Sequence, residues 1–597
     1  MIRSCSRILF KNQCIVNNNK LTKASLWTAL WRDAENRAIS NVNKKWFVKP
    51  IRPRRYSTGW DGKSDTNFFI DNNDNKKESR NYYPFFVAGA VICLGFYFSK
   101  DAFAQENKVE EKEEEISDDK ELTNDAPSYL YNIPYLLIGG GTSSYYASLA
   151  IRSKDPNAHC LIITEEEITP YQRPPLSRDV WWYGDEETPE TLSYTTLLGK
   201  KRQVSYESDG FFINPKEISE FEHGAVSIIK GKKVIKLEPE NHKAILDDGT
   251  EIIYKKCLIG TGSKARELKE LKKDELKNYV TTLRDVNDYR DIANKIKEGK
   301  KDFVIIGGGL LGTELTASLL KIKKDDKLNI TQIFRGTGVL RKQLPQFMSD
   351  FTAMELKKMG VNVKSNTNVT DGSILEDGKV KLSLINENGE KSEIITEHVI
   401  VAIGATPNTE LGAKSGFELD PVLDGICTDS GMRSTLHPDV FVAGDVSSFY
   451  DPLFGRRRVE HWEHAQITGR VAGENMAGGC KTYTHQGSWF TILAPHIHYT
   501  SVGRTDPDLE TVSIFAQDAE KEHPEDKEPT QKGVIFYTEN KRIVGVVLMN
   551  VFGIGVEIAR RLIMDKKEIE NFVEVAKLFA LYPEPGSDET DTLEKSE

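Results

Sequence analysis

Two glycine-rich turns of the same design constrain this chain more than any other feature. One, at residues 139–141, follows the apolar run 135–138, and the other, at 307–309, follows 303–306. In a dinucleotide-binding unit, the first glycine makes a tight turn, the second lets the backbone approach a pyrophosphate, and a small third residue packs helix on strand. Phosphate then binds the free amides at the helix N-terminus. Two such units predict two nucleotides, most simply a flavin and a nicotinamide.

The residues after the first turn extend this pattern. We expect a helix to about Lys154 and a strand over 160–164. That strand ends in Glu165, where an acid would bond a ribose hydroxyl. A plain acidic loop is the alternative, because two more glutamates follow. Ser144 takes the third fingerprint position and is small enough to keep the packing.

Other segments suit a flavoprotein with two nucleotides. Residues 171–178 hold two prolines between two arginines, which can fix cations beside a pyrophosphate or an isoalloxazine edge, although a surface loop is the alternative. The small-residue turns at 260–262 and 404–408 each follow an apolar strand and are the expected crossing points between the two nucleotide domains. Asp445 ends the run 440–444 and would accept from a flavin ribityl hydroxyl.

The N-terminal region is strongly basic. Residues 1–55 hold thirteen lysines and arginines against two acids, a composition typical of a mitochondrial transit peptide, here 1–56. A disordered arm that binds nucleic acid is the alternative. The whole chain carries a net charge of −10, so removing this segment leaves a more acidic protein, which argues against general nucleic-acid affinity.

Residues 82–98 form an apolar run that predicts a single transmembrane anchor. Seventeen residues span roughly 26 Å, close to the hydrocarbon thickness of a bilayer. The flanking tyrosines and Lys100 suit the interface, whereas a buried core helix is the alternative. The acidic stretch after it, within 99–130, cannot form a core and predicts a solvated linker.

The seven cysteines include no CxxC or CxxxxC pair. The chain therefore lacks the redox pair of a disulfide reductase and any metal-ligand spacing, and no metal site is predicted. Cys160 and Cys257 lie in apolar runs and are expected in the core.

Together these motifs resemble the FAD- and NAD(P)-linked reductase superfamily over about 131–485 and, within it, the apoptosis-inducing factor family to about Tyr582. The most specific segments are 173–177, 455–461 and 532–537. The resemblance implies an α/β fold with two Rossmann-like domains and a C-terminal α+β domain. The expected boundaries are 131–265 and 405–485 for the FAD domain, 266–404 for the NAD(P) domain, 486–582 for a dimerisation-type domain, and 583–597 for a disordered tail.

The resemblance also implies site residues. The expected FAD contacts are Gly139, Gly140, Gly141, Thr142, Ser143, Glu165, Glu166, Arg173, Arg178, Val234, Arg284, Asp445, His461, Trp462 and Phe490. The expected nicotinamide contacts are Gly308, Gly309, Leu310, Leu311, Lys342, Gly404, Glu460 and His461. Arg178, Glu314 and His461 are the expected catalytic group, with Arg178 facing Glu314 so that each keeps the other ionised.

Four positions depart from the family pattern. Arg178 replaces a lysine beside the flavin, Leu310 replaces an aromatic that stacks on nicotinamide, and Phe490 replaces a tryptophan, although Trp489 is adjacent. The strand expected at 330–334 ends in Arg335 and Gly336, where the family has an acid for the ribose. An arginine there accommodates a 2′-phosphate, so a weaker preference for NADH over NADPH is expected; loop drift without consequence is the alternative.

The family implies an FAD-dependent NAD(P)H oxidoreductase that is anchored in the mitochondrial inner membrane and faces the intermembrane space. Hydride passes slowly to FAD and gives a charge-transfer state that dimerises and binds partners, among them the thiol oxidoreductase of intermembrane-space import. The family supports respiratory-complex biogenesis and, after release, joins caspase-independent cell death in the nucleus with DNA binding. The alternative is an ordinary NAD(P)H-quinone or ferredoxin-type reductase.

Two basic or polar segments leave their roles open. The arginines at 456–458, with Lys264 and Lys323, could bind DNA, but a solvated turn or a dimer edge is the preferred interpretation. Residues 517–531 predict a short exposed loop where the family often carries a long insertion that is released on reduction. A strand over 541–549 and a helix over 555–565 complete the C-terminal region.

Overall fold

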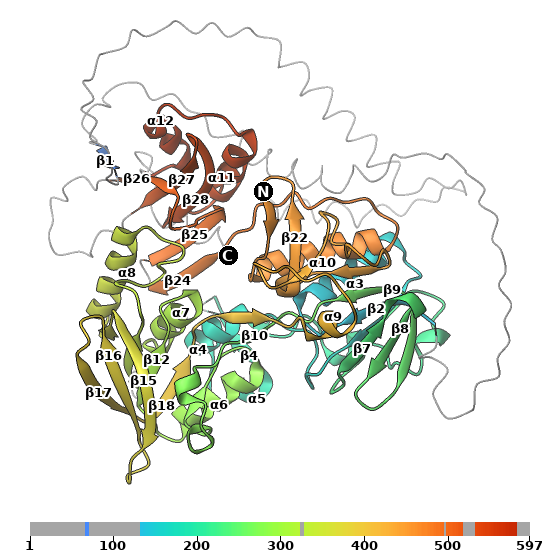
Figure 1. Cartoon of the computed structure of the whole chain (residues 1–597), viewed down its shortest axis with the longest axis horizontal. Coiled ribbons are helices and arrows are strands. Elements are labelled where there is room, and N and C mark those ends of the chain that lie inside the picture. Colours follow the sequence, from blue (N-terminus) through green and yellow to red (C-terminus); the bar gives the residue numbers. More distant parts are fainter. Residues whose placement is uncertain are drawn as a thin grey trace, which may run out of the picture. The chain divides into compact units, whose positions relative to one another are not determined.

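The computed structural model describes residues 66–70, 132–196, 198–322, 327–494, 497–516 and 532–581. The predicted transit peptide, anchor, linker, 517–531 loop and tail lie outside these residues, as does Lys323. Among the described helices, none has the length and apolar character needed to cross a bilayer. The fold is mixed α/β with two dinucleotide-binding units and a C-terminal α+β unit, as predicted (Figure 1).

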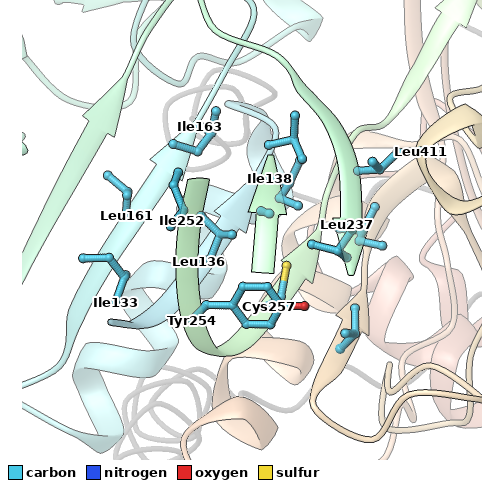
Figure 2. Packing of buried hydrophobic residues seen from close by; sticks show 14 of the residues in the cluster. Ile133, Leu136, Ile138, Leu161, Ile163, Leu237, Ile252, Tyr254, Cys257 and Leu411 are labelled. Atoms are coloured by element: carbon cyan, nitrogen blue, oxygen red, sulfur yellow. The ribbon is translucent and has the colours of Figure 1, made fainter. Parts of the chain in front are cut away.

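The first nucleotide unit is built on a seven-stranded sheet with the order β6-β3-β2-β9-β8-β7, and β21 pairs with β9. β21 comes from much later in the chain, so two separate segments build one sheet. The core of this unit consists of aliphatic side chains with Tyr254 and Cys257 (Figure 2). The strands are β2 (Ile133–Ile138), β3 (His159–Ile163), β6 (Ala225–Ile229), β7 (Val234–Glu238), β8 (Lys243–Leu246), β9 (Glu251–Ile259) and β21 (Val440–Val442).

Helix α10 (Trp462–Met476) packs directly on α3 (Thr142–Lys154), the helix that the first turn opens. Two glycines of α10 make this close approach possible. A Cβ atom on Gly469 would lie 2.3 Å from the Ser143 carbonyl oxygen, and one on Gly473 would lie 2.4 Å from that of Ala147. The returning segment therefore holds the first phosphate-binding helix in place.

The second nucleotide unit is a parallel five-stranded sheet with the order β11-β18-β12-β13-β14. An antiparallel meander of β15, β16 and β17 adjoins it in sequence. The strands are β11 (Val280–Thr281), β12 (Asp302–Ile306), β13 (Asn329–Ile333), β14 (Asn362–Lys364), β15 (Thr367–Ile374), β16 (Val380–Asn386), β17 (Lys391–Thr396) and β18 (His398–Val401), and the helices are α6 (Val286–Lys297), α7 (Leu310–Leu319) and α8 (Gln346–Lys358).

The two predicted crossing points lie beside each other. β10 (Ser263–Ala265) follows the first and β19 (Ala405–Pro407) follows the second, and the two strands pair antiparallel. The chain thus leaves and re-enters the first unit through one two-stranded ribbon. The exact domain boundaries stay a prediction.

The C-terminal unit has the sheet order β1-β26-β27-β28-β25-β24. Its strands are β1 (Thr66–Ile70), β24 (Phe490–Ala494), β25 (Ile497–Gly503), β26 (Glu510–Ala516), β27 (Gly533–Glu539) and β28 (Arg542–Met549), with helices α11 (Gly555–Asp565) and α12 (Phe572–Ala576). The strand and helix expected near 541–565 are confirmed. β1, which pairs parallel with β26, was not foreseen because its sequence lies between two presumed targeting segments.

Short elements connect these units. They are α4 (Asp179–Tyr183), α5 (Thr188–Thr191), α9 (Glu410–Lys414), η4 (Pro174–Ser177), β4 (Ser193–Thr195), β5 (Lys201–Gln203), β20 (Ile426–Cys427), β22 (Ser447–Asp451) and β23 (Gly455–Arg457). Of these, η4 and α9 carry residues to the cavity described below.

Candidate functional site

A cavity of about 1660 Å³ lies at the carboxyl ends of β2, β3 and β9, the edge where open α/β sheets bind ligands. Both nucleotide units and the C-terminal sheet contribute to its lining. The residues that carry the argument are Gly139–Ser143, Glu165, Glu166, Arg173, Ser177, Val234, Ser263, Arg284, Leu310, Leu311, Glu314, Asp445, Glu460, His461, Trp462 and Phe490. The cavity thus brings together most of the residues predicted to bind FAD.

The first turn has the backbone shape that a pyrophosphate needs. Gly139 has φ +104°, and a Cβ atom on it would lie 2.4 Å from the Gly260 carbonyl oxygen, so only glycine fits. At Gly141, by contrast, a Cβ atom would meet nothing within 4 Å. The backbone there faces open space at the start of α3, where free amides favour phosphate.

The two acids after β3 have different partners. Glu166 accepts from Arg173 Nη2 at 2.8 Å and from the Tyr171 hydroxyl at 2.7 Å, and all three side chains are partly or fully buried. Glu165 is exposed and pairs with Lys233 at 2.7 Å. Arg173 is therefore fixed at the cavity wall by Glu166, and Glu165 retains solvent access beside it.

Asp445 forms an ion pair inside the cavity. Its Oδ2 atom accepts from Arg284 Nη2 at 2.9 Å and from Ser263 Oγ at 2.7 Å. Burial alone would raise the pKa of Asp445, but the Arg284 guanidinium and the hydroxyl donor outweigh it, and the pKa falls below its ordinary value. Asp445 is thus an ionised acceptor at neutral pH, as a ribityl-binding carboxylate must be.

Arg178 lies near enough to Glu314 for its charge to lower the pKa of that carboxyl group, but among the described residues the two side chains form no ion pair. Among the described residues, Arg178 pairs with its neighbour Asp179 at 3.0 Å, and its guanidinium lies 5.3 Å from the centre of the Phe490 ring. Glu314 instead accepts from the hydroxyls of Ser177 at 2.6 Å and Thr491 at 2.9 Å. Asp179 is adjacent to Arg178 in the chain, so this ion pair forms without bringing two distant segments together.

The ionisation of Glu314 is corrected as well. Burial raises the pKa of Glu314, and the opposing effects of the Arg178 charge and the two hydroxyls do not cancel it. The carboxyl group is therefore harder to ionise than an ordinary glutamate. Because Ser177 belongs to η4 and Thr491 to β24, Glu314 also links three parts of the fold at the cavity floor.

His461 and its neighbours form another wall. The His461 Nδ1 atom accepts from the Glu463 amide at 3.3 Å and caps α10, and burial lowers the pKa of His461, which favours the neutral ring. The ring meets Phe490 edge-on, with centroids 5.7 Å apart. Trp462 donates from Nε1 to the Tyr206 hydroxyl at 2.7 Å. Phe490, rather than Trp489, lines the cavity.

Only some of the residues predicted to contact the nicotinamide nucleotide line this cavity. Leu310 and Leu311 at the start of α7 reach the same cavity, as do Glu460 and His461. Gly308, Gly309, Lys342 and Gly404 are not part of its lining, and Lys342 is exposed. Gly307 nevertheless repeats the first turn, with φ +134° and a Cβ position 2.1 Å from the Ala402 carbonyl oxygen.

Several residues of this site escaped sequence reasoning. Tyr206 joins Trp462 to Thr142, whose Oγ1 lies 3.0 Å from the Tyr206 hydroxyl, and Ser263 supports Asp445. Asp179 and Thr491 set the surroundings of Arg178 and Glu314. Only Ser177 lay in a quoted motif. Asp179 contacts the adjacent Arg178, whereas the contacts of Tyr206, Ser263 and Thr491 join distant segments, for which a single sequence holds no signal.

Residues 134–469 match the pyridine nucleotide-disulphide oxidoreductase family, and the chain belongs to it. Residues 472–531 and 517–565 match the C-terminal domain of mitochondrion-associated apoptosis-inducing factor. Apoptosis-inducing factor 1 of Dictyostelium discoideum is 36% identical over 73% of this chain and 79% of its own length. A Drosophila melanogaster protein named for the same factor is 32% identical over 76% of this chain and 66% of its own length.

A solved complex of putidaredoxin reductase with putidaredoxin shares the fold, with a TM-score of 0.61 and 18% identity over 78% of this chain and 97% of that one. Within this family the chain is an FAD-dependent NAD(P)H oxidoreductase of the apoptosis-inducing-factor type. The disulphide of the family name has no counterpart among the described cysteines, since Cys160, Cys257, Cys427 and Cys480 are all free.

Proposed function

We propose that this protein passes electrons slowly from NAD(P)H to FAD and uses the reduced state to control its own association. One observation carries this proposal: Leu310, Leu311 and Glu314, from the helix that the second turn opens, line the cavity that the first turn begins. A nicotinamide held on the second turn would therefore meet a flavin held on the first. Holding two reactants in one cavity supplies proximity and orientation.

The residues of the first unit fit FAD. The open position at Gly141 would admit the pyrophosphate, Glu165 would bind the adenosine ribose, and the ionised Asp445 would accept from the ribityl chain. When bound, FAD supplies the acceptor for the hydride of NAD(P)H. The chain's own part is to orient both nucleotides, to exclude water, and to place Glu314, whose pKa burial raises, in the cavity lining.

Two features favour slow turnover and a binding role. Leu310 has no aromatic face with which to stack on nicotinamide, so a productive complex is less well ordered. The C-terminal sheet contributes Phe490 to the cavity lining, and its Thr491 donates a hydrogen bond to Glu314, which also lines the cavity. A change at the flavin would therefore reach the C-terminal unit directly, which supports a redox-gated dimer and partner binding.

The cellular setting is proposed from the same resemblance. The basic start of the chain, the apolar run at 82–98 and the mitochondrial names of the two relatives favour a mitochondrial protein anchored in the inner membrane and facing the intermembrane space. There it would bind the import thiol oxidoreductase and support respiratory-complex biogenesis. Cell-death activity and nuclear entry would follow release.

DNA binding receives little support from the arginine run. Arg457 pairs with Asp451 at 3.1 Å, and Arg458 pairs with Glu460 at 2.5 Å. Arg456 donates to the carbonyl oxygens of Thr428 at 2.8 Å and Ser448 at 2.6 Å. Each arginine of the run therefore has a partner within the protein, although Arg456 is exposed, and the run is not a free basic patch.

The test compares sedimentation of the purified protein, under anaerobic conditions, before and after NADH addition. A rise from monomer to dimer together with a long-wavelength charge-transfer band that persists in air is the expected result. Full flavin reduction with an unchanged sedimentation coefficient and rapid reoxidation would instead favour the second candidate, an ordinary quinone or ferredoxin-type reductase. That candidate draws support from the fold shared with putidaredoxin reductase.

A further inference from the structure

The loop after β13 is bound to the second glycine turn. The Leu340 amide donates to the Gly308 carbonyl oxygen at 2.6 Å, and a Cβ atom on Gly308 would lie 2.9 Å from the Phe334 ring. Arg335, which follows Phe334, is therefore fixed beside the turn. In a nucleotide unit of this kind, the residue after the second strand selects the substituent on the adenosine ribose.

Two arginines of this loop lack a carboxylate partner in the described part of the chain. Arg335 is exposed and makes no hydrogen bond or ion pair with any described residue. A Cβ atom on Gly336 would lie 3.9 Å from the Cβ of Arg341, so the Arg341 stem borders the space that a side chain at 336 would occupy. The Arg341 guanidinium donates one N–H to the Leu344 carbonyl oxygen at 3.3 Å, and its other N–H groups can donate to a ligand.

Two acids near the loop already have donors. Asn366 donates from its backbone to the Gly336 carbonyl oxygen at 2.8 Å, and its side-chain amide binds Glu387 at 2.8 Å. Gln346 bonds the Thr337 hydroxyl and also donates to Asp350 at 2.8 Å. Both carboxylates keep their negative charge, because their donors are neutral amides, but neither forms an ion pair with Arg335 or Arg341.

We propose that Arg335 and Arg341 form a binding site for the 2′-phosphate of a phosphorylated adenine dinucleotide, so that the second unit takes NADPH in preference to NADH. The inference rests on the proposed function, since it names the substrate of that second unit. The guanidinium groups offer paired donors that match phosphate oxygens. No equivalent cation follows the first unit's strand, where Glu165 and Glu166 stand instead.

The test is calorimetric titration of the FAD-loaded protein with 2′,5′-ADP and, separately, with ADP, two fragments that cannot reduce the flavin. The wild-type protein should bind 2′,5′-ADP about 10- to 100-fold more tightly than ADP. Arg335→Gln should remove most of this difference and leave ADP binding unchanged. Arg202→Gln, a change at an exposed arginine of β5, is the matched control and should preserve the difference. Gly336→Glu should reverse the preference by restoring an acid.

Equal affinity of the wild-type protein for the two fragments, or an unchanged preference in Arg335→Gln, would overturn the inference. Flavin reduction by NADH decides the proposed function separately. If NADH reduces the flavin but 2′,5′-ADP binds no more tightly than ADP, the proposed oxidoreductase function is supported and the proposed phosphate site is wrong. If 2′,5′-ADP binds more tightly than ADP but neither NADH nor NADPH reduces the flavin, the phosphate site is supported and the proposed oxidoreductase function is wrong.

Discussion

The two nucleotide units share a backbone and differ in their side chains. Gly139 and Gly307 both have positive φ, at +104° and +134°. A Cβ atom on Gly139 would collide with the Gly260 carbonyl oxygen, and one on Gly307 with the Ala402 carbonyl oxygen. A Cβ atom placed on Gly141 or on Gly309 would meet no other atom within 4 Å, so both positions face open space. The backbone therefore forms the same phosphate cradle twice.

The side chains around the two cradles give them different tasks. The first unit has acids after its second strand and an ion pair between Arg284 and Asp445, whereas the second has Arg335, which forms no ion pair with a described residue. The first is supported by the returning helix α10, whereas the second contributes Glu314 to the shared cavity. The two units thus share one backbone turn and differ at their strand ends, which is where the proposed difference in nucleotide choice lies.

The largest effects are expected from alanine at the first glycine of each turn. Gly139→Ala and Gly307→Ala would each force a Cβ atom into a carbonyl oxygen at positive φ, at a cost of about 3 kcal/mol or more. Gly139→Ala should yield protein without flavin. Gly307→Ala should keep its flavin but lose reduction by NADH. Flavin absorbance and NADH titration separate the two, and loss of flavin in both variants would contradict a division of labour between the turns.

A smaller effect is expected at the ion pair of the first unit. Arg284→Met leaves Asp445 buried without its cation, which should lower the free energy of unfolding by about 3 kcal/mol and weaken FAD retention. The measurement is chemical denaturation of the FAD-loaded protein. Lys264→Met, at an exposed ion pair with Glu410, is the control and should change stability by less than about 1 kcal/mol. Equal effects of the two changes would contradict the account of Asp445.

A pH-dependent effect is expected at Glu314. Because burial raises its pKa in the folded protein, the proton it retains stabilises the fold below the unfolded value of about 4.3, and this contribution is lost as pH rises through the folded pKa. Glu314→Gln cannot titrate. The wild-type protein should therefore lose unfolding free energy relative to this variant between pH 4 and neutral. A flat difference, or one of the opposite slope, would show that Glu314 is paired and ionised.

The smallest effect is expected at the third fingerprint position, where the units also differ. Ser144 is fully buried and its hydroxyl has no hydrogen-bond partner among the described residues. Ser144→Ala should change the free energy of unfolding by no more than about 1 kcal/mol and leave flavin content unaltered. Thermal unfolding measures this. A loss of flavin would mean that the hydroxyl itself binds the nucleotide.

Sequence reasoning succeeded where local sterics decide the structure. The glycine turns, the helix to Lys154 and the strand at 542–549 follow from patterns within a few residues. The two crossing points were predicted from their small-residue turns, although the antiparallel pairing of β10 with β19 was not. These features depend on backbone geometry, which short motifs encode directly.

It failed where two distant segments compete for one group. The resemblance had Arg178 facing Glu314, and its charge does act on that carboxyl group, but the direct partner of Arg178 is Asp179, and the donors to Glu314 are Ser177 and Thr491. The link from Tyr206 to Trp462 was missed for the same reason, since these residues meet only after the whole first unit folds. The predicted roles of the site residues stay predictions until a bound nucleotide is tested.

The most direct test of the central claim is anaerobic titration of the purified protein with NADH and, separately, NADPH, followed by the visible spectrum. If two turns hold a flavin and a nicotinamide in one cavity, the protein should purify with FAD, and one equivalent of either reduced nucleotide should bleach the oxidised-flavin absorbance. A flavin that stays oxidised with both nucleotides, in a protein that still binds them, would contradict the account.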